Sequence, residues 1–300
     1  MRFGGHETFP VREGWLHKGL KLVEADHEAF KDPFVADTLG VGRNMAKSIR
    51  HWLIATGLAE TRAGAAGGKN KLLVPTAFGQ VVLENDPYFL QTGTWLALHI
   101  NLVNNPDEAQ SWQWFFSRYS PQRFDRIACS EALKRFLESS AQRAPVLRTL
   151  QRDIACLLST YAVPVPNEHA DPEDAADSPF RRLGLLTYFR DSHTYRRNET
   201  DITAIPAEML GYALSVSGAL HEGDIPLREA CFVEGGLGRC LQLSLDAFIN
   251  VVEKAETDLP RDAVLILGSA GERKVHIDNR CPNEWLEEFY QRTYAPGAAA

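Results

Sequence analysis

Residues 32–82, DPFVADTLGVGRNMAKSIRHWLIATGLAETRAGAAGGKNKLLVPTAFGQVV, decide the fold of the first part of the chain. Pro33 fits the first turn of a helix, where its missing N–H group costs no hydrogen bond. A tight turn is predicted at 40–42, because glycine tolerates positive φ and close helix–helix approach. A second helix is predicted from about Arg43 to Thr56, and Gly57 follows it as a C-terminal stop.

The second predicted helix has one apolar and one polar face. Its apolar residues recur at the i, i+4, i+7 and i+8 positions of a helix with one buried side. The buried side carries Met45, Ile49, Trp52, Leu53 and Thr56, and the opposite side carries Arg43, Asn44, Lys47, Arg50 and His51. Two helices joined by a short glycine turn, the second with a basic outer face, are typical of a helix-turn-helix.

The residues after this helix pair favour a β-wing. Leu58 to Arg62 is predicted as a strand, residues 63–70 as a glycine-rich tip, and Lys71 to Pro75 as the returning strand. The cations of this wing are Arg62, Lys69 and Lys71. Thr76 is placed to cap a further helix. The whole stretch therefore predicts a winged helix-turn-helix.

The charge of this region favours contact with double-stranded DNA. Between Leu39 and Pro75 the sequence has six Lys or Arg residues and one acid, Glu60. A helix fits the major groove, where amide and guanidinium groups read base edges, and cations of a wing neutralise phosphates. The alternative is a purely structural helix pair with a solvated charged face, which is common in enzymes and assembly proteins.

Length and composition indicate a soluble globular protein of two or three domains. The chain has 300 residues, 44% hydrophobic and 24% charged, and a net charge of −7. Because proteins that coat nucleic acid are usually basic, we expect DNA contact through a local, salt-sensitive patch, supported by partner subunits or a homodimer. Five scattered cysteines without a CxxC pair favour reduced thiols. Without an apolar run of membrane-spanning length, we expect a cytoplasmic location and no membrane partner.

The N-terminal segment MRFGGHETFPVREGWLHKGL allows two interpretations. His6, Glu7 and Arg12 in a glycine-bounded turn ahead of a helix could form a polar site, because His moves protons, Glu holds a divalent metal and Arg clamps a phosphate. Alternatively the segment is a capping structure, in which Glu7 pairs with Arg12 or accepts backbone N–H bonds. The residue types alone favour the capping structure.

The fold class expected for the whole chain is mainly α (α+β). Residues 88–162 read as helical, with tryptophans and phenylalanines in the core and His99 as a hydrogen-bonded core residue. The expected division is a winged helix-turn-helix at 1–87, a helical domain at 88–162, an acidic Pro-rich linker at 163–178, a C-terminal α+β winged-helix-like domain at 179–294 and a disordered tail at 295–300.

Charged residues crowd a predicted hairpin within the C-terminal domain. They are Asp191, His193, Arg196, Arg197, Glu199 and Asp201. Carboxylates beside arginines could serve metal-assisted phosphodiester cleavage, but exposed hairpins are usually charged, and this spacing matches no nuclease motif. The chain also lacks a GxxxxGK[ST] loop and a GxGxxG motif after a strand, so we expect no nucleotide cofactor.

Four motifs carry a resemblance to a known family. They are FGGHETFPVREGWLHKG at 3–19, LGVGRNMAKSIRHWL at 39–53, SPFRRLGLL at 178–186 and IPAEMLGYAL at 205–214. Together they resemble the bacterial family catalogued as domain of unknown function 4007. Members are encoded beside DNA phosphorothioation genes, which specify a cysteine desulfurase, a sulfotransfer enzyme and an ATPase. The member from single-stranded, Ssp-type systems is held to nick DNA.

The resemblance therefore implies a DNA-nicking protein of a phosphorothioation defence system, with those enzymes as partners. It makes the segment around His6 and Glu7 a candidate part of the active site without saying which residues cut. Our hypothesis places the cleavage site near His6 and Glu7, with a divalent cation such as Mg²⁺ or Mn²⁺ and with Arg12 on the phosphate. The alternative is a non-enzymatic, sequence-reading adaptor or regulator that recruits the modification enzymes.

Overall fold

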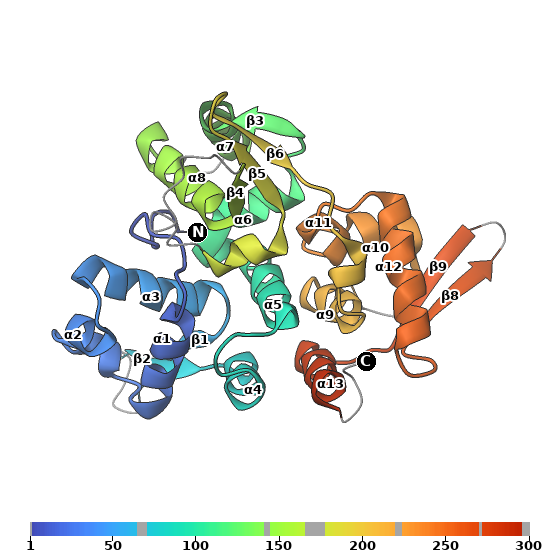
Figure 1. The fold of residues 1–300 in the computed structure, drawn as a ribbon, viewed down its shortest axis with the longest axis horizontal. Coiled ribbons are helices and arrows are strands. Elements are labelled where there is room, and N and C mark those ends of the chain that lie inside the picture. Colours follow the sequence, from blue (N-terminus) through green and yellow to red (C-terminus); the bar gives the residue numbers. More distant parts are fainter. Residues whose placement is uncertain are drawn as a thin grey trace.

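A computed structural model describes residues 2–64, 71–140, 145–165, 178–219, 224–269 and 272–295. Figure 1 shows the N-terminal helices at one end, the C-terminal hairpin at the other, and helix α5 between them. A contiguous apolar core runs from Val11 to Tyr290 through every part of the described chain. The predicted mixed α and β content is confirmed.

The N-terminal elements follow the predicted order. They are α1 (Trp15–Ala25), the short helix η1 (Ala29–Lys31), α2 (Val35–Leu39), α3 (Arg43–Ala55), the strands β1 (Ala59–Ala63) and β2 (Lys71–Pro75), and α4 (Ala77–Asn85). Gly40 ends α2 in the left-handed conformation, with φ 67°. The two strands pair antiparallel, with Ala59 opposite Pro75. Local periodicity and turn glycines therefore predicted this part of the chain correctly.

Helix α4 begins with a side-chain cap and packs closely against the backbone of the turn that follows α3. The Thr76 hydroxyl oxygen accepts the N–H of Gly79 at 3.0 Å, as the sequence predicted. A Cβ atom on Gly79 would lie 2.1 Å from the carbonyl oxygen of Leu58. Because that oxygen belongs to the backbone and cannot swing away, only glycine allows α4 to pack here.

The middle of the chain is not all-helical, contrary to the prediction. Its elements are α5 (Thr92–Val103), α6 (Pro106–Ser117), β3 (Arg123–Asp125), α7 (Arg126–Ser139), α8 (Leu147–Tyr161) and β4 (Ala162–Pro164). The two strands escaped prediction because each has only three residues, too few to show a period of two.

These two strands belong to a sheet that crosses the predicted domain boundary. The order is β3-β6-β5-β4, in which β5 (Leu186–Phe189) and β6 (Thr194–Arg197) come from beyond the predicted linker. β4 pairs parallel with β5, and β3 pairs antiparallel with β6. Strands from both sides of the segment 163–178 therefore share one sheet. Most of it, residues 166–177, lies outside the described residues, as does the tail at 296–300.

The C-terminal part consists of helices, a short strand and a β-hairpin. Its elements are η3 (Pro179–Leu183), η4 (Ile202–Ala204), α9 (Glu208–Val216), β7 (Ile225–Pro226), α10 (Leu227–Phe232), α11 (Leu237–Cys240), α12 (Leu245–Asp258), β8 (Val264–Ser269), β9 (Glu272–Ile277) and α13 (Pro282–Tyr294). The sheet order β7-β9-β8 places the short strand β7 beside the hairpin. None of the helices in the described part of the chain is both long and apolar enough to cross a membrane.

His99 is a hydrogen-bonded core residue, as predicted. Its ring is fully buried on α5, with Nδ1 2.8 Å from the Tyr161 hydroxyl and Nε2 2.9 Å from the carbonyl oxygen of Cys240. Burial lowers the pKa of His99 to about 4, because the charged ring would lose its hydration. At neutral pH the neutral ring donates one hydrogen bond and accepts the other, which links α5, α8 and α11.

Candidate nucleic-acid interface

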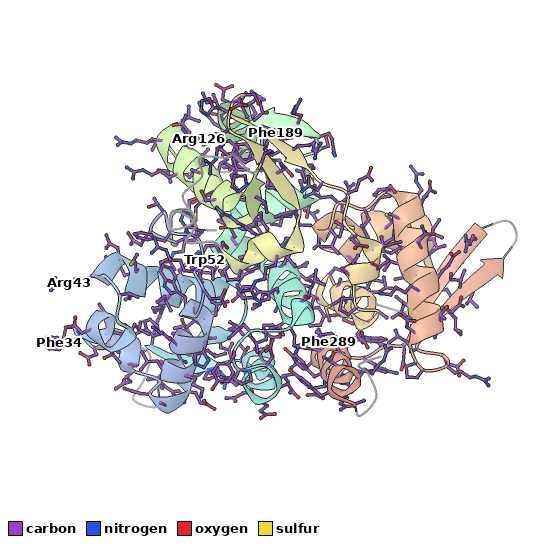
Figure 2. All side chains as sticks on the ribbon, viewed as in Figure 1. Phe34, Arg43, Trp52, Arg126, Phe189 and Phe289 are labelled. Atoms are coloured by element: carbon purple, nitrogen blue, oxygen red, sulfur yellow. The ribbon has the colours of Figure 1, made fainter. Side chains whose placement is uncertain are left out.

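The exposed polar side of α3 is shorter than the sequence predicted. Arg43, Asn44 and Lys47, in the first two turns, are exposed. Figure 2 shows Arg43 and Phe34 at the same outer edge of the molecule, and Phe34 is 66% exposed. The N-cap residue Gly42 offers no side-chain acceptor, so the first N–H groups of α3 also face outward without a capping side chain. This end of α3 is therefore basic and exposed, with Lys47 next to the Glu7 carboxylate.

Arg50 lies at the rim of this surface. Its side chain is half-buried, and its pKa is lowered by burial and by the nearby guanidinium of Arg2. Glu108, on α6, opposes this shift. Arg50 thus has less contact with solvent than the cations of the first two turns.

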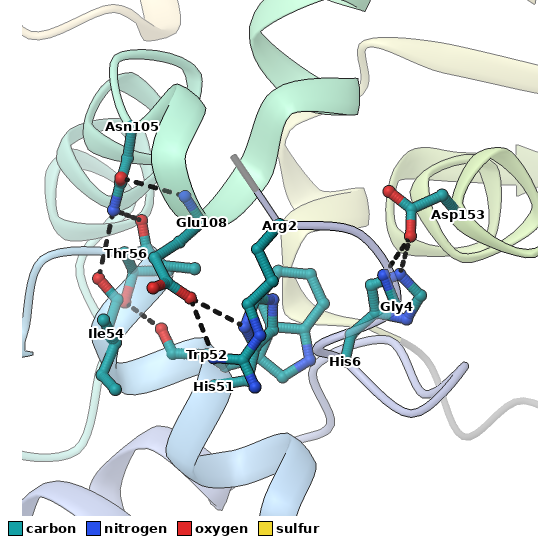
Figure 3. Close-up of polar contacts among 11 residues, drawn as sticks. Arg2, Gly4, His6, His51, Trp52, Ile54, Thr56, Asn105, Glu108 and Asp153 are labelled. Atoms are coloured by element: carbon teal, nitrogen blue, oxygen red, sulfur yellow. Dashed lines mark hydrogen bonds and ion pairs between the residues drawn. The ribbon is translucent and has the colours of Figure 1, made fainter. Parts of the chain in front are cut away.

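The prediction that His51 lies on the exposed face is wrong. His51 is 2% exposed, and its ring packs 5.6 Å from Trp52 and 6.0 Å from His6. Its Nδ1 lies 3.6 Å from a carboxylate oxygen of Glu108, and burial lowers the pKa of the ring. The N-terminal loop covers it so closely that a Cβ atom on Gly5 would lie 2.5 Å from this nitrogen. His51 is therefore a packing residue between α3 and that loop (Figure 3).

An open groove of about 570 Å³ runs along the turn between α2 and α3. Arg12, Trp15, Asp37, the turn 40–42 and Met45 line it. The guanidinium of Arg12 lies 5.6 Å from the Trp15 ring and 5.8 Å from the Phe9 ring. Arg12 is among the residues that line the groove, and within the described residues its guanidinium forms no ion pair. The groove brings Arg12 next to the free end of α3.

The N-terminal loop is fixed by one buried carboxylate on α8 (Figure 3). Asp153 Oδ1 accepts the N–H of Gly4 at 2.7 Å and lies 2.9 Å from His6 Nε2, and its Oδ2 accepts the Ser111 hydroxyl at 2.6 Å. Because the Thr8 N–H donates to Nδ1 of His6, the ring proton resides on Nε2 and points at Asp153. His6 is 1% exposed, so both nitrogens are engaged away from solvent. His6 is therefore a buried residue that anchors the loop, and the loop is held by Asp153 and not by the Glu7–Arg12 pair of the capping interpretation.

Glu7 and Thr8 adopt a conformation that is unfavourable for their residue types. Their φ angles are 50° and 69°, in the left-handed region that usually holds glycine. Strained backbone persists where surrounding contacts determine it and is common at functional sites. The Glu7 side chain is 38% exposed, and its Oε1 lies 4.0 Å from Lys47 Nζ, not beside Arg12. The loop therefore presents a carboxylate to the basic end of α3.

The wing contributes fewer free cations than predicted. Arg62 is paired with Glu60 on the same strand, with its Nε 2.7 Å from Oε1. Lys71 is exposed at the start of β2, opposite Ala63. Lys69 lies outside the described residues. The strongest positive charge in the described part of this region is thus on α3 and in the groove.

The predicted divalent cation directs attention to His, Cys, Asp and Glu side chains that lie close together. Nowhere in the described ranges do three or more His, Cys, Asp or Glu side chains converge. This holds for the loop around Glu7 and for the charged hairpin at 191–201, where Arg197 is buried. No side chain of the described ranges is therefore assigned as a metal ligand.

The residues that organise this site were not found from the sequence. Asp153 and Ser111 hold the loop from α8 and α6, and Glu108 pairs with Arg2 at 3.1 Å. Their sequence neighbourhoods read as ordinary amphipathic helices. Asp153, an isolated acid among the apolar residues of α8, was the one feature of the sequence that could have indicated the site. The sequence alone does not identify its partner.

Comparisons with known proteins give a consistent result. The described fold is similar to "Magnesium ion-bound SspB crystal structure", with a TM-score of 0.83 and 25% identity over 99% of this chain and 90% of that chain. A second structure, "SspB crystal structure", gives a TM-score of 0.83 and 25% identity over 98% of this chain and 89% of that one. No curated protein sequence matches the chain significantly. Residues 3–292 match the family described as "Protein of unknown function (DUF4007)", and the chain therefore belongs to that family.

Proposed function

We propose that this chain is a DNA-binding protein of a bacterial DNA phosphorothioation system and that it nicks the DNA it binds. The observation that carries the proposal is the free, basic end of α3, where Arg43, Asn44 and Lys47 project beside the Arg12 groove. The association with a phosphorothioation system is inferred from the family resemblance, and the similarity to SspB supports this association. The cysteine desulfurase, the sulfotransfer enzyme and the ATPase are the proposed protein partners, with a homodimer as a further proposed state.

In this proposal the N-terminal elements act as a winged helix-turn-helix. The first two turns of α3 enter the major groove of the duplex, where Asn44 has the amide groups that read base edges and Arg43 and Lys47 contact phosphates. Arg12 and the uncapped N–H groups of α3 contact a phosphate, and Lys71 contacts the neighbouring backbone. Arg50 makes at most a rim contact, because its side chain is half-buried.

Replacing Arg43 and Lys47 with alanine should weaken duplex binding. We expect the Kd for a 30-base-pair duplex to rise by at least about tenfold, because two phosphate contacts are lost. The slope of log K against log salt should fall by about 1.8, at roughly 0.9 per phosphate. Fluorescence anisotropy at several salt concentrations measures both quantities.

The matched control replaces Lys18 and Lys21, two exposed cations of α1, with alanine. This pair removes the same charge, and its Kd and salt slope should stay close to those of the unmodified protein. Equal slopes in the test pair and the unmodified protein would refute contact through α3.

A supercoiled-plasmid assay tests nicking. We expect open circles in the presence of Mg²⁺ or Mn²⁺, and their loss in Glu7→Ala, because Glu7 is the exposed carboxylate beside the basic surface. His6→Ala should also lose activity, since the loop that presents Glu7 would be released from Asp153. Activity retained in both variants, with folding intact, would move the cleavage site elsewhere.

A non-enzymatic adaptor is the second candidate function. Two observations favour it: His6 is enclosed and engaged through both ring nitrogens, and no three-ligand cluster exists among the described residues. An adaptor should bind duplex DNA equally well without divalent cations and should never convert supercoiled plasmid to open circles. The same assay therefore separates the two candidates.

A further inference from the structure

The sheet β3-β6-β5-β4 has a polar outer face that has no role in the proposed duplex binding or nicking. In the register of the sheet, Arg123 lies opposite Arg196, and Arg196 lies opposite Thr187. Phe189 follows two residues after Thr187 and so lies on the same face. Phe124, Tyr195 and Tyr188 point to the opposite face, where Phe124 contacts Phe115 and Tyr119. The two faces therefore differ sharply in character.

Two guanidinium groups cover one aromatic ring on this outer face. The Arg123 guanidinium lies 4.8 Å and the Arg196 guanidinium 5.4 Å from the centre of the Phe189 ring. Arg123 and Arg196 are exposed. The cation–π contacts hold both planar groups on a sheet surface open to solvent.

Four arginines around this outer face form no ion pair within the described part of the chain. Arg123, Arg126, Arg190 and Arg196 form no ion pair with any described residue, although the chain has 39 acids and 32 Lys or Arg residues. Other arginines of this acidic chain, such as Arg118 and Arg182, do pair with glutamates. Figure 2 shows Arg126 and Phe189 at the same end of the molecule.

Two acids lie nearby and do not neutralise these arginines. Asp125 accepts the N–H of Ala128 at 2.8 Å and so caps α7. Asp191 is exposed in the turn between β5 and β6. A local excess of cations therefore remains for an anionic partner.

We propose that this outer face binds single-stranded DNA. A single strand offers phosphates for the arginines and unpaired bases that stack on guanidinium and aromatic planes. A duplex hides its base faces and offers this surface phosphates alone, so it would leave the planar guanidinium groups that Phe189 holds without a stacking partner. The site is separate from α3, and it extends the proposed function to the strand that is freed when DNA is opened.

The test uses a fluorescent 12-nucleotide oligothymidine and the full chain. Replacing Arg123 and Arg196 with glutamine should weaken binding at least tenfold and lower the salt slope by about 1.4, at roughly 0.7 per phosphate of a single strand. Phe189→Leu should weaken binding roughly fivefold or more, with an unchanged salt slope, because the ring that holds both guanidinium planes in place for base stacking is lost. Circular dichroism and thermal melting check that each variant folds.

A chemically equivalent cluster elsewhere in the chain provides the control. Arg228 and Arg239 lie 5.7 and 5.2 Å from the ring of Phe232, but on helices rather than on a sheet. Replacing both with glutamine removes the same charge and should change oligothymidine affinity less than twofold. An equal loss in this control would overturn the proposal, because affinity would then follow total charge.

The outcome also separates this site from the proposed function. The Arg43 and Lys47 variant should lose duplex affinity and keep oligothymidine affinity, whereas the sheet variants should do the reverse. If the unmodified protein does not bind oligothymidine at low salt, or if the α3 variant loses that binding equally, the sheet proposal is wrong. Neither result bears on duplex binding through α3.

Discussion

Asp153→Ala is expected to destabilise the protein by about 4 kcal/mol. The substitution removes the acceptor of three hydrogen bonds, from the Gly4 N–H, the His6 ring and the Ser111 hydroxyl. Each donor would stay buried without a partner, at about 1–3 kcal/mol each, and breaking a buried polar pair typically costs about 3–5 kcal/mol. Urea unfolding followed by tryptophan fluorescence measures the change in free energy of unfolding.

Two further variants make this experiment specific. Arg152→Gln changes the neighbouring exposed residue and should alter stability by less than about 0.5 kcal/mol. Asp153→Asn keeps one acceptor oxygen and should cost less than the alanine variant. A loss below about 1 kcal/mol in Asp153→Ala would show that the N-terminal loop is held by other contacts.

The same substitution should disturb the proposed DNA surface. Asp153 fixes the loop that covers His51 and presents Glu7 beside Lys47. We expect the loop to become accessible to proteases in Asp153→Ala at temperatures where the rest of the chain is folded, because its main anchor is absent.

Arg197→Ala is expected to cost about 4 kcal/mol of stability. Arg197 is 5% exposed on β6, and its guanidinium donates to the carbonyl oxygens of Phe115, Tyr119 and Pro121 at 3.0, 2.6 and 3.2 Å. It also lies 4.3 Å from the centre of the Phe115 ring. Alanine would leave a cavity and three unsatisfied acceptors between the sheet and α6.

The adjacent residue gives a matched comparison for this prediction. Arg196 has the same side chain but is exposed on the other face of the strand, so Arg196→Ala should change stability by less than about 0.5 kcal/mol. Burial lowers the pKa of Arg197 to about 10, which leaves it charged at neutral pH and held by carbonyl dipoles. Similar losses of stability in Arg196→Ala and Arg197→Ala would contradict the assignment of Arg196 to the exposed face of β6 and Arg197 to the buried face.

The sequence determined those features that depend on residues a few positions apart. The helix α3, the left-handed Gly40 and the Thr76 cap were all predictable, because helical periodicity, turn conformation and capping act within about four residues. The core position of His99 followed for the same reason, since it lies on an apolar stripe.

The tertiary structure alone decided the features whose partners are distant in sequence. His51 reads as a residue of the outer face of α3, yet Gly5 and Glu108 enclose it from segments 46 and 57 positions away. β3 and β4 exist only because β6 and β5 pair with them. Asp153 meets His6 across 147 residues.

The physical reason for this division is the range over which each interaction specifies structure. Backbone propensity, periodicity and capping depend on residues close to one another in the chain, so they can be predicted from the local sequence. Which side of an amphipathic helix is open, and which arginine of a pair such as Arg196 and Arg197 is buried, depends on segments that pack against it. Those contacts form only once loop closure brings distant residues together, and they decide which of the predicted cations remain free to meet DNA.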